Sequence, residues 1–306
     1  MIPYTPLQLV FFFLVYCFFG WIIESTWVSL HAKRFTNRGF MRGPFIPIYG
    51  FGAMTLLLVG TPLLKWPVAV FFAGMFAASI LEYFTGAAME AIFKVRYWDY
   101  SDKPFNINGH VCLFCSVAWG VLAVVLDYLV HKPIAALSTY LTLKELKLIT
   151  IAVSVYFIVD LTLSFKAAFD LRDLIVKMEK ATDELRIMQK RLDVALAYAN
   201  ASREEFMEEQ FDKIEDLAKS IEGKFDSLKK AMEEKPSEFA ESIKDEVREL
   251  RDKFNFHKMS EFGLSTFKGF YKRGTVLGNP TMASKKFKGS LESIKQLVAK
   301  DKNKKD

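Results

Sequence analysis

Residues 7–30 read LQLVFFFLVYCFFGWIIESTWVSL, an almost unbroken apolar run interrupted by the acidic residue Glu24. An α-helix rises about 1.5 Å per residue, so a run of this length crosses a hydrocarbon layer roughly 30 Å thick. A secretory signal would carry basic residues before its apolar core. Here the basic residues follow the run, at Lys33, Arg34, Arg38 and Arg42. The run therefore predicts an uncleaved membrane span whose N-terminus lies outside.

The composition differs between the two halves of the chain. Hydrophobic residues make up 51% of the 306 residues, 29 of them Phe, and the mean hydropathy is +0.15, yet 25% of the residues are charged. These are the averages of an apolar half and a charged half. We expect a transmembrane helical domain over residues 1–169, a cytoplasmic helical hairpin or coiled coil over 170–257, and a basic C-terminal tail with a terminal helix over 258–306.

Four further spans are predicted from the lengths and flanks of the apolar runs. They are Pro47–Leu64, which is short and contains glycines, then Trp66–Phe93, Val111–Val130 and about Leu148–Phe169. The fold class is therefore all-α, a polytopic membrane bundle of about five spans followed by a cytoplasmic helical or coiled-coil domain. The short loops on the side that follows the first span carry more Lys and Arg, which favours an outside N-terminus and a cytoplasmic C-terminal domain.

This topology brings two unusual loops to the inner end of the bundle. The first is NRGFMRGPFIPIYGFG at residues 37–52, and the second is KVRYWDYSDKPFNINGH at residues 94–110. The sequence leaves open whether the first loop re-enters the bilayer. Three carboxylates of the neighbouring spans should face the same end. The candidate ligand-binding residues are Glu24, Asn37, Arg38, Arg42, Glu82, Glu90, Arg96, Asp99, Asn106, Asn108 and His110.

Three interpretations of this cluster are open. Carboxylates in a bilayer need partners, so the Glu–Arg pairs could simply lock the loops against the helices. Alternatively, Arg38, Arg42 and Arg96 could bind an anionic group, such as a lipid phosphate or an anionic substrate, with help from the amides of Gly39 and Gly43. In the third interpretation, the carboxylates of Glu24 and Glu82 form a proton relay.

Other motifs point away from cofactor chemistry. Cys112 and Cys115 form a C-x-x-C pair, but their flanks are apolar and no second pair has zinc spacing, so we expect packing, and no metal or cofactor. The sequence contains no G-x-x-x-x-G-K-[ST] phosphate loop and no hydrolase or dinucleotide motif. Catalytic residues stay unknown, whether the protein is an enzyme stays undecided, and no nucleic-acid partner is expected.

The charged half carries a heptad pattern. Apolar residues from Leu171 to Ala199 step by three and four, and a second apolar stripe runs from Phe239 to Phe254 after Pro236. An intramolecular hairpin and a homo-oligomer held by a coiled coil both fit. The tail after Lys258 mixes lysines with aromatic residues, which favours docking on an anionic membrane surface, although a solvated tail fits as well.

Four stretches resemble one known family: FGWIIES at 19–25, NRGFMRGPFIPIYGFG at 37–52, LEYFTGAAMEAIF at 81–93 and YWDYSDKPFNINGHVCLFCSVAWG at 97–120. They are similar to the bacterial membrane proteins grouped as ABC-transporter permeases of the CmpB-like, or type IV, group. His110 and Tyr97 depart from the family pattern, which commonly has Arg and Trp there.

The resemblance implies a permease-like membrane subunit of a transport system in the bacterial cell membrane, with the P-loop ATPase on a separate chain. The alternatives are a membrane-embedded protein or enzyme that binds a phosphorylated lipid or another anion at the cytoplasmic leaflet, and a membrane-anchored coiled-coil scaffold. The lipid bilayer is a partner in each case.

Overall fold

A computed structural model describes residues 4–200, 245, 248 and 270–303. The chain divides into two compact units, one made of residues 1–173 and 267–306 and the other of residues 174–266. The first unit contains the apolar helices, the loops between them and the C-terminal helices.

The first three helices begin in the same way, because proline occupies the first turn of each. They are α1 (Pro6–Ala32), α2 (Pro47–Gly60) and α3 (Pro67–Phe93). Proline suits this position because its fixed φ is helical and its missing N–H would have no partner there. Thr5 also caps α1 in a capping box with Gln8. Lysines in the left-handed conformation end α1 and α3, at Lys33 and Lys94.

The remaining elements follow in chain order. They are the short 3₁₀ helix η1 (Thr61–Leu63), the two-residue strands β1 (Asn106–Ile107) and β2 (Val111–Cys112), α4 (Leu113–Val125), the π-helical turn η2 (Leu126–Val130), α5 (His131–Tyr140), α6 (Leu143–Asn200), α12 (Phe270–Leu277) and α13 (Lys288–Asn303). The strands pair antiparallel, with Asn106 opposite Cys112.

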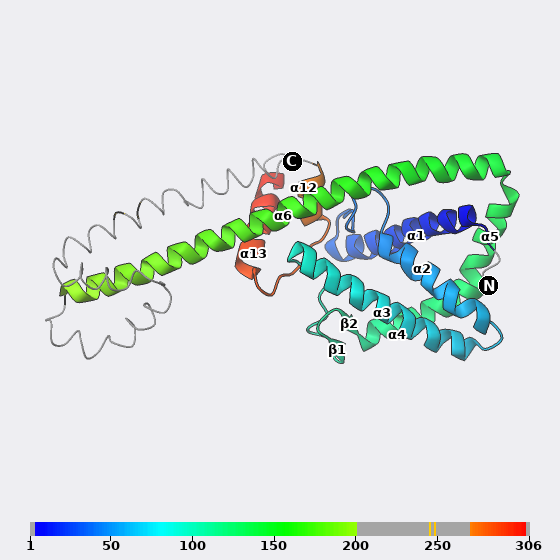
Figure 1. Cartoon of the computed structure of the whole chain (residues 1–306), viewed down its shortest axis with the longest axis horizontal. Coiled ribbons are helices and arrows are strands. Elements are labelled where there is room, and N and C mark those ends of the chain that lie inside the picture. The colour runs from blue at the N-terminus through cyan, green and yellow to red at the C-terminus, as the bar shows by residue number, and fades with distance from the viewer. Residues whose placement is uncertain (1–3, 201–244, 246–247, 249–269, 304–306) are drawn as a thin grey trace. The chain divides into compact units, whose positions relative to one another are not determined.

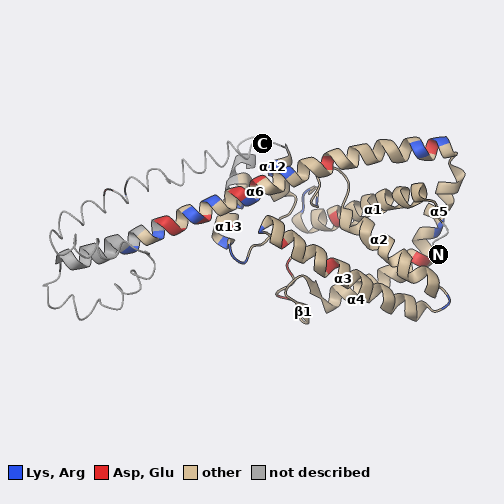
Figure 2. Ribbon diagram, in the orientation of Figure 1, with Lys and Arg blue, Asp and Glu red and all other residues tan. Residues whose placement is uncertain are grey.

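The predicted all-α membrane fold is confirmed. In the described part of the chain, four helical stretches are long and apolar enough to cross a membrane: 6–32, 67–93, 113–140 and 143–184. The predicted second span forms α2, a shorter apolar helix. The fourth span was predicted to end at Val130, but the helix continues through a π turn to Tyr140. Figure 2 shows these helices as mostly uncharged, and large side chains such as Ile23, Phe76 and Ile151 are exposed on them, as lipid-facing surfaces require.

The first four helices pack in sequence in this bundle, α1 against α2, α2 against α3 and α3 against α4 (Figure 1). Small residues allow the close approaches. A Cβ at Gly74 of α3 would overlap Ala123 of α4, and a Cβ at Gly20 of α1 would overlap the ring of Tyr49 on α2. Such contacts are the usual means of helix association in membranes. Phe12 and Val70 lie in the buried core between them.

The segment after α1 turns back along that helix. Trp21 Nε1 donates to Asn37 Oδ1 at 2.6 Å, and the backbone N–H of Ile46 donates to the carbonyl of Cys17 at 3.0 Å, near the middle of α1. Met41 is fully buried in this segment, and the N–H of Gly43 donates to Asp160 at 2.8 Å. Residues 33–46 therefore re-enter the helix bundle, and side chains of the protein shelter and satisfy their irregular backbone.

The C-terminal helices belong to the same unit as the apolar bundle. Between α12 and α13, residues 278–287 pair with the loop after α3, where the Arg96 N–H donates to the Ala283 carbonyl at 2.7 Å and the reverse bond is 3.0 Å. We call the end of the bundle where residues 33–46, 94–112 and 278–287 meet the loop end. This part of the basic tail therefore contacts protein loops.

The heptad residues 171–199 lie within the continuous helix α6, as the pattern predicts. The pairing of this helix in a coiled coil stays a prediction. The predicted stripe of residues 239–254 lies, apart from residues 245 and 248, outside the described residues.

Candidate functional site

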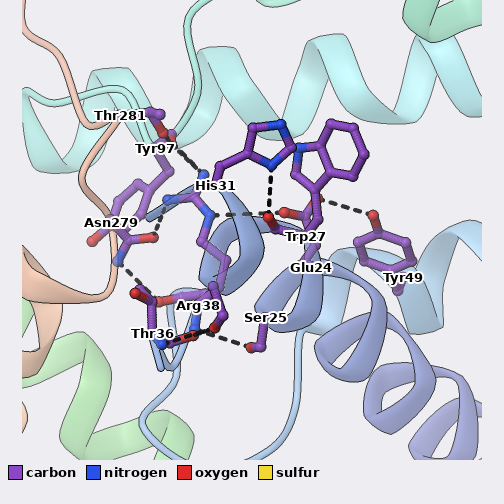
Figure 3. A network of polar contacts seen from close by, with 12 residues as sticks. Glu24, Ser25, Trp27, His31, Thr36, Arg38, Tyr49, Tyr97, Asn279 and Thr281 are labelled. Carbon is purple, nitrogen blue, oxygen red and sulfur yellow. Dashed lines mark hydrogen bonds and ion pairs between the residues drawn. The ribbon is translucent and has the colours of Figure 1, made fainter. Parts of the chain in front are cut away.

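The first charged contact of the loop end joins Glu24 of α1 to Arg38 of the re-entrant segment (Figure 3). Arg38 Nε lies 3.8 Å from Glu24 Oε2, and the Tyr49 hydroxyl donates to Glu24 Oε1 at 3.0 Å. Ser25, one residue along α1, accepts a bond from the Arg38 N–H at 3.1 Å. The carboxylate predicted to need a partner within the first span therefore has a cation and a hydroxyl.

The remaining donors of Arg38 reach two other segments. Nη1 donates to Asn279 Oδ1 at 3.0 Å, while Nη2 donates to the Tyr97 carbonyl at 3.1 Å and to Thr281 Oγ1 at 3.2 Å. Burial lowers the pKa of the Arg38 guanidinium, and the charge of Glu24 opposes that shift. Arg38 thus joins the re-entrant segment, the loop after α3 and the C-terminal segment, and every guanidinium nitrogen has an internal partner (Figure 3).

The second charged contact centres on Arg96, whose side chain is 4% exposed. Its Nη2 lies 2.8 Å from Glu90 Oε2 and its Nη1 lies 3.1 Å from Asp99 Oδ1. His110 Nε2 also approaches the Glu90 carboxylate, at 3.3 Å. The hydrogen bond with Glu90 raises the pKa of Arg96, so the guanidinium stays charged. Glu90, Arg96, Asp99 and His110, all predicted site residues, form one group.

The predicted asparagines build the turns of the second loop. Asn106 Nδ2 donates to the carbonyls of Ser101 and Lys103, and its Oδ1 accepts from the Gly109 N–H. Asn108 adopts a left-handed φ of 54° and donates to the Tyr83 hydroxyl at 3.0 Å. Asparagine is favoured at such positions because its short amide tolerates this conformation and bonds to nearby backbone. These side chains shape the loop.

Glu82 is held differently from the other acids. It is 6% exposed, and its carboxylate accepts from Trp119 Nε1 at 3.0 Å and from the Tyr100 hydroxyl at 3.2 Å. The sequence suggests Arg38, Arg42 or Arg96 as its partner, but the hydrogen bonds that the structure describes come from neutral groups. Trp119 and Tyr100 are uncharged, so no charge pattern in the sequence identifies them as partners of Glu82.

Asn37 and Arg42 form a third group in the re-entrant segment. The Asn37 amide donates to the Arg42 carbonyl, and Arg42 Nη2 donates to the Gly39 carbonyl at 2.9 Å. Gly274 and Gly278 of the C-terminal segment lie directly against the Arg42 side chain, where a Cβ would overlap it. Burial lowers the pKa of Arg42 to about 10, which still leaves the group charged at neutral pH.

Sequence reasoning missed the contribution of the C-terminal segment. Asn279 is buried, accepts from Arg38 and donates to the Gly39 carbonyl at 2.9 Å. Ser284 Oγ donates to the Lys94 carbonyl at 2.9 Å. The asparagine follows Gly278 and precedes Pro280, a turn signal, but a turn signal does not show which distant loop the segment contacts.

This arrangement can be compared with known proteins. Residues 11–165 match the model of a family described as "Putative ABC-transporter type IV". The chain belongs to this family. The resemblance found in the sequence is therefore confirmed, and the matched range contains every predicted site residue. Neither a curated protein nor a solved structure matches the chain.

The cysteines of this type IV family member are free thiols in the structure. Cys112 Sγ caps α4 by accepting from the Cys115 N–H at 3.4 Å, and the two sulfurs are 3.1 Å apart. Among the described residues, no group of three or more His, Cys, Asp or Glu side chains could hold a metal ion. The packing role predicted for the pair is compatible with its position at the start of α4.

Proposed function

We propose that the protein is the membrane subunit of a transport system whose ATPase is a separate polypeptide that docks at the loop end. The match of residues 11–165 to the type IV family is the observation that carries this proposal. The sequence adds that none of its 306 residues forms a phosphate-binding loop, so ATP hydrolysis would come from a partner.

The charge distribution favours a cytoplasmic loop end. The described C-terminal segment adds basic residues to those of the two loops, namely Lys272, Arg273, Lys285, Lys286, Lys288 and Lys295. The opposite end carries Lys65, Lys132, Lys144 and Lys147. An excess of Lys and Arg marks the cytoplasmic side of a membrane protein. The ATPase would then meet the loops on the side where ATP is available.

The hairpin of β1 and β2 offers a docking element. Phe105, directly before β1, is 80% exposed and Ile107 of β1 is 60% exposed, while the ion pairs of Arg96 and the turns of Asn106 hold the surrounding loop in place. Apolar side chains on a rigid, polar-rimmed support are typical of interaction sites. A soluble ATPase could therefore recognise these two side chains without rearranging the bundle.

Co-purification tests the proposal. The full chain, extracted gently from its own membranes, should carry a P-loop ATPase identified by mass spectrometry, and the complex should hydrolyse ATP. Phe105→Ser should reduce the recovered ATPase at least several-fold without lowering the melting temperature of the membrane subunit. Tyr140→Ser is the matched control, because Tyr140 is an equally exposed aromatic residue at the end of α5.

Two outcomes would reject the proposal. One is a preparation with no enriched P-loop ATPase, even after chemical crosslinking in the membrane. The other is an ATPase whose recovery is the same in wild type and Phe105→Ser, because docking would then occur elsewhere.

A further inference from the structure

Arg42 differs from Arg38 and Arg96 in its contacts. Arg38 and Arg96 each contact a carboxylate, whereas no ion pair of Arg42 is found within the described ranges. Its side chain is 5% exposed and Nε has no hydrogen-bond partner there. A buried charge with unused donors is costly unless an anion compensates it. Arg96 Nε is unpartnered as well, but Arg96 already has two carboxylates.

The acid that attracts Arg42 electrostatically is largely engaged by other groups. Asp160 attracts Arg42 electrostatically, yet its Oδ2 accepts from the Gly43 N–H at 2.8 Å and its carboxylate also bonds the hydroxyl of Tyr271. These bonds hold Asp160 in place. Within the described structure, the guanidinium group of Arg42 therefore forms no ion pair with an acid.

A small cavity with a mixed polar and apolar lining lies beside Arg42. Its volume is about 100 Å³, roughly three times the volume of one water molecule in the liquid. Its lining comes from the re-entrant segment and the end of α12: Arg34, Phe35, Thr36, Asn37, Arg42, Leu277 and Gly278. Two arginines lining one space of this size suit a single phosphate group, because arginine binds phosphate through paired charge-assisted hydrogen bonds.

A larger groove adjoins this cavity and runs along the C-terminal half of α1. Its volume is about 560 Å³, and Arg34 and Phe35 line both spaces. The other lining residues are Trp21, Ile22, Ser25, Thr26, Ser29, Leu30 and Lys33. The groove follows the last turns of a helix that is long and apolar enough to span a membrane, and its lining residues Ile22 and Leu30 are exposed, as a surface in contact with lipid would be. Lys33 and Arg34 place positive charge at the end where a headgroup would lie.

We propose that the cavity and the groove together bind one anionic phospholipid, with its phosphate at Arg34 and Arg42 and an acyl chain along α1. A free anion would fill the cavity and leave the groove unused. A lipid uses both, and its negative headgroup complements three cations. The inference does not depend on transport or on an ATPase. The lipid would also connect the re-entrant segment to α12, because Gly278 completes the wall of the cavity.

Native mass spectrometry of the full-length protein in mild detergent tests this site. The probes are phosphatidylglycerol, phosphatidylcholine with the same acyl chains, and inorganic phosphate. The wild type should retain one phosphatidylglycerol at least several-fold better than phosphatidylcholine, and inorganic phosphate should not displace it. Arg34→Gln and Arg42→Gln should each lose most of this preference.

A second set of variants separates the site from general attraction. Thr26→Trp, at an exposed groove position, should reduce retention by filling the groove while leaving every charge in place. Lys103→Gln removes one exposed positive charge from the other loop and should leave retention unchanged. Arg34→Gln and Thr26→Trp change exposed residues, so they test the site even if Arg42→Gln fails to fold.

Three results would overturn the proposal. Equal retention of the two lipids would show that headgroup charge is not recognised. An equal loss in Lys103→Gln would indicate non-specific electrostatics. Displacement by inorganic phosphate, with retention unaffected by Thr26→Trp, would assign the cavity to a free anion.

Discussion

The two ends of the membrane bundle solve the problem of buried polar groups in different ways. At the loop end, charged side chains pair across segments, as in Glu24 with Arg38 and Glu90 with Arg96. At the opposite end, His131 bonds two neutral hydroxyls, those of Tyr16 at 2.7 Å and Tyr4 at 2.9 Å. The ion pairs join α1 and α3 to the loops that directly follow them, while the neutral bonds join His131 of α5 to Tyr16 and Tyr4, 115 and 127 residues away in the chain. The comparison teaches that the charges hold the loops in place.

Loss of Arg96 should have the largest effect. Arg96→Gln leaves Glu90 and Asp99 without their shared cation, so we expect a destabilisation of about 3 kcal/mol, as for other broken buried pairs. Thermal unfolding of the detergent-purified protein measures it. Arg172→Gln is the control, because its pair with Asp173 is more exposed and should cost no more than about 0.5 kcal/mol. Equal losses in both variants would mean that the loop end does not depend on its charges.

Asn279→Ala should have the next largest effect, a destabilisation of about 2 kcal/mol, because it leaves the buried Arg38 Nη1 without its acceptor and removes one of the two donors to the Gly39 carbonyl. The C-terminal segment should then be cleaved faster by a protease added to the intact protein. Glu292→Gln removes only an exposed pair with Lys295 and serves as the control. A cleavage rate unchanged in Asn279→Ala would contradict the role of this residue in holding the segment.

Loss of His131 at the opposite end should destabilise the protein less than the two changes above, and the loss should not depend on salt. His131→Phe keeps a planar ring but deprives Tyr16 and Tyr4 of their partner, for an expected loss of about 1 kcal/mol. Because the bonds are neutral, the loss should be equal at low and high salt. His31→Phe is the matched control at an exposed histidine. A salt-dependent loss in His131→Phe would remove the distinction between the two ends.

The smallest effect concerns pH. Burial and the neighbouring Arg96 lower the pKa of His110, with Lys285 adding to the shift and Glu90 and Asp99 opposing it. A histidine whose pKa is lower in the folded state binds protons more readily when unfolded, so its contribution to stability falls as the pH drops below about 6.5. His110→Asn should lose less stability than wild type between neutral and mildly acidic pH. A larger loss of stability at mildly acidic pH in His110→Asn than in wild type would contradict this explanation.

The sequence was sufficient for most of the helices because their signals are local, though not for the length of α2 as a span or for the end of the fourth span. The apolar run from Leu7, the prolines at residues 6, 47 and 67, and the glycines between them define the spans. It also placed Glu24 and Arg38 at one depth, through helix length and charge order alone.

The partners of the site were beyond sequence reasoning because they depend on long-range packing. Nothing near Asn279 in the chain indicates Arg38, 241 residues away. Glu82 was expected to need a cation, but its carboxylate accepts hydrogen bonds from the neutral groups of Trp119 and Tyr100. Patterns in a sequence show that a buried acid needs a partner, and only the fold shows which one it has.

Hydrogen exchange of the full-length protein tests the central claim, that Arg38 holds three segments together as one unit. In Arg38→Gln, peptides covering residues 36–46, 94–100 and 279–284 should all exchange faster, while peptides of α4 stay unchanged. Faster exchange confined to residues 36–46, or no change at all, would contradict it.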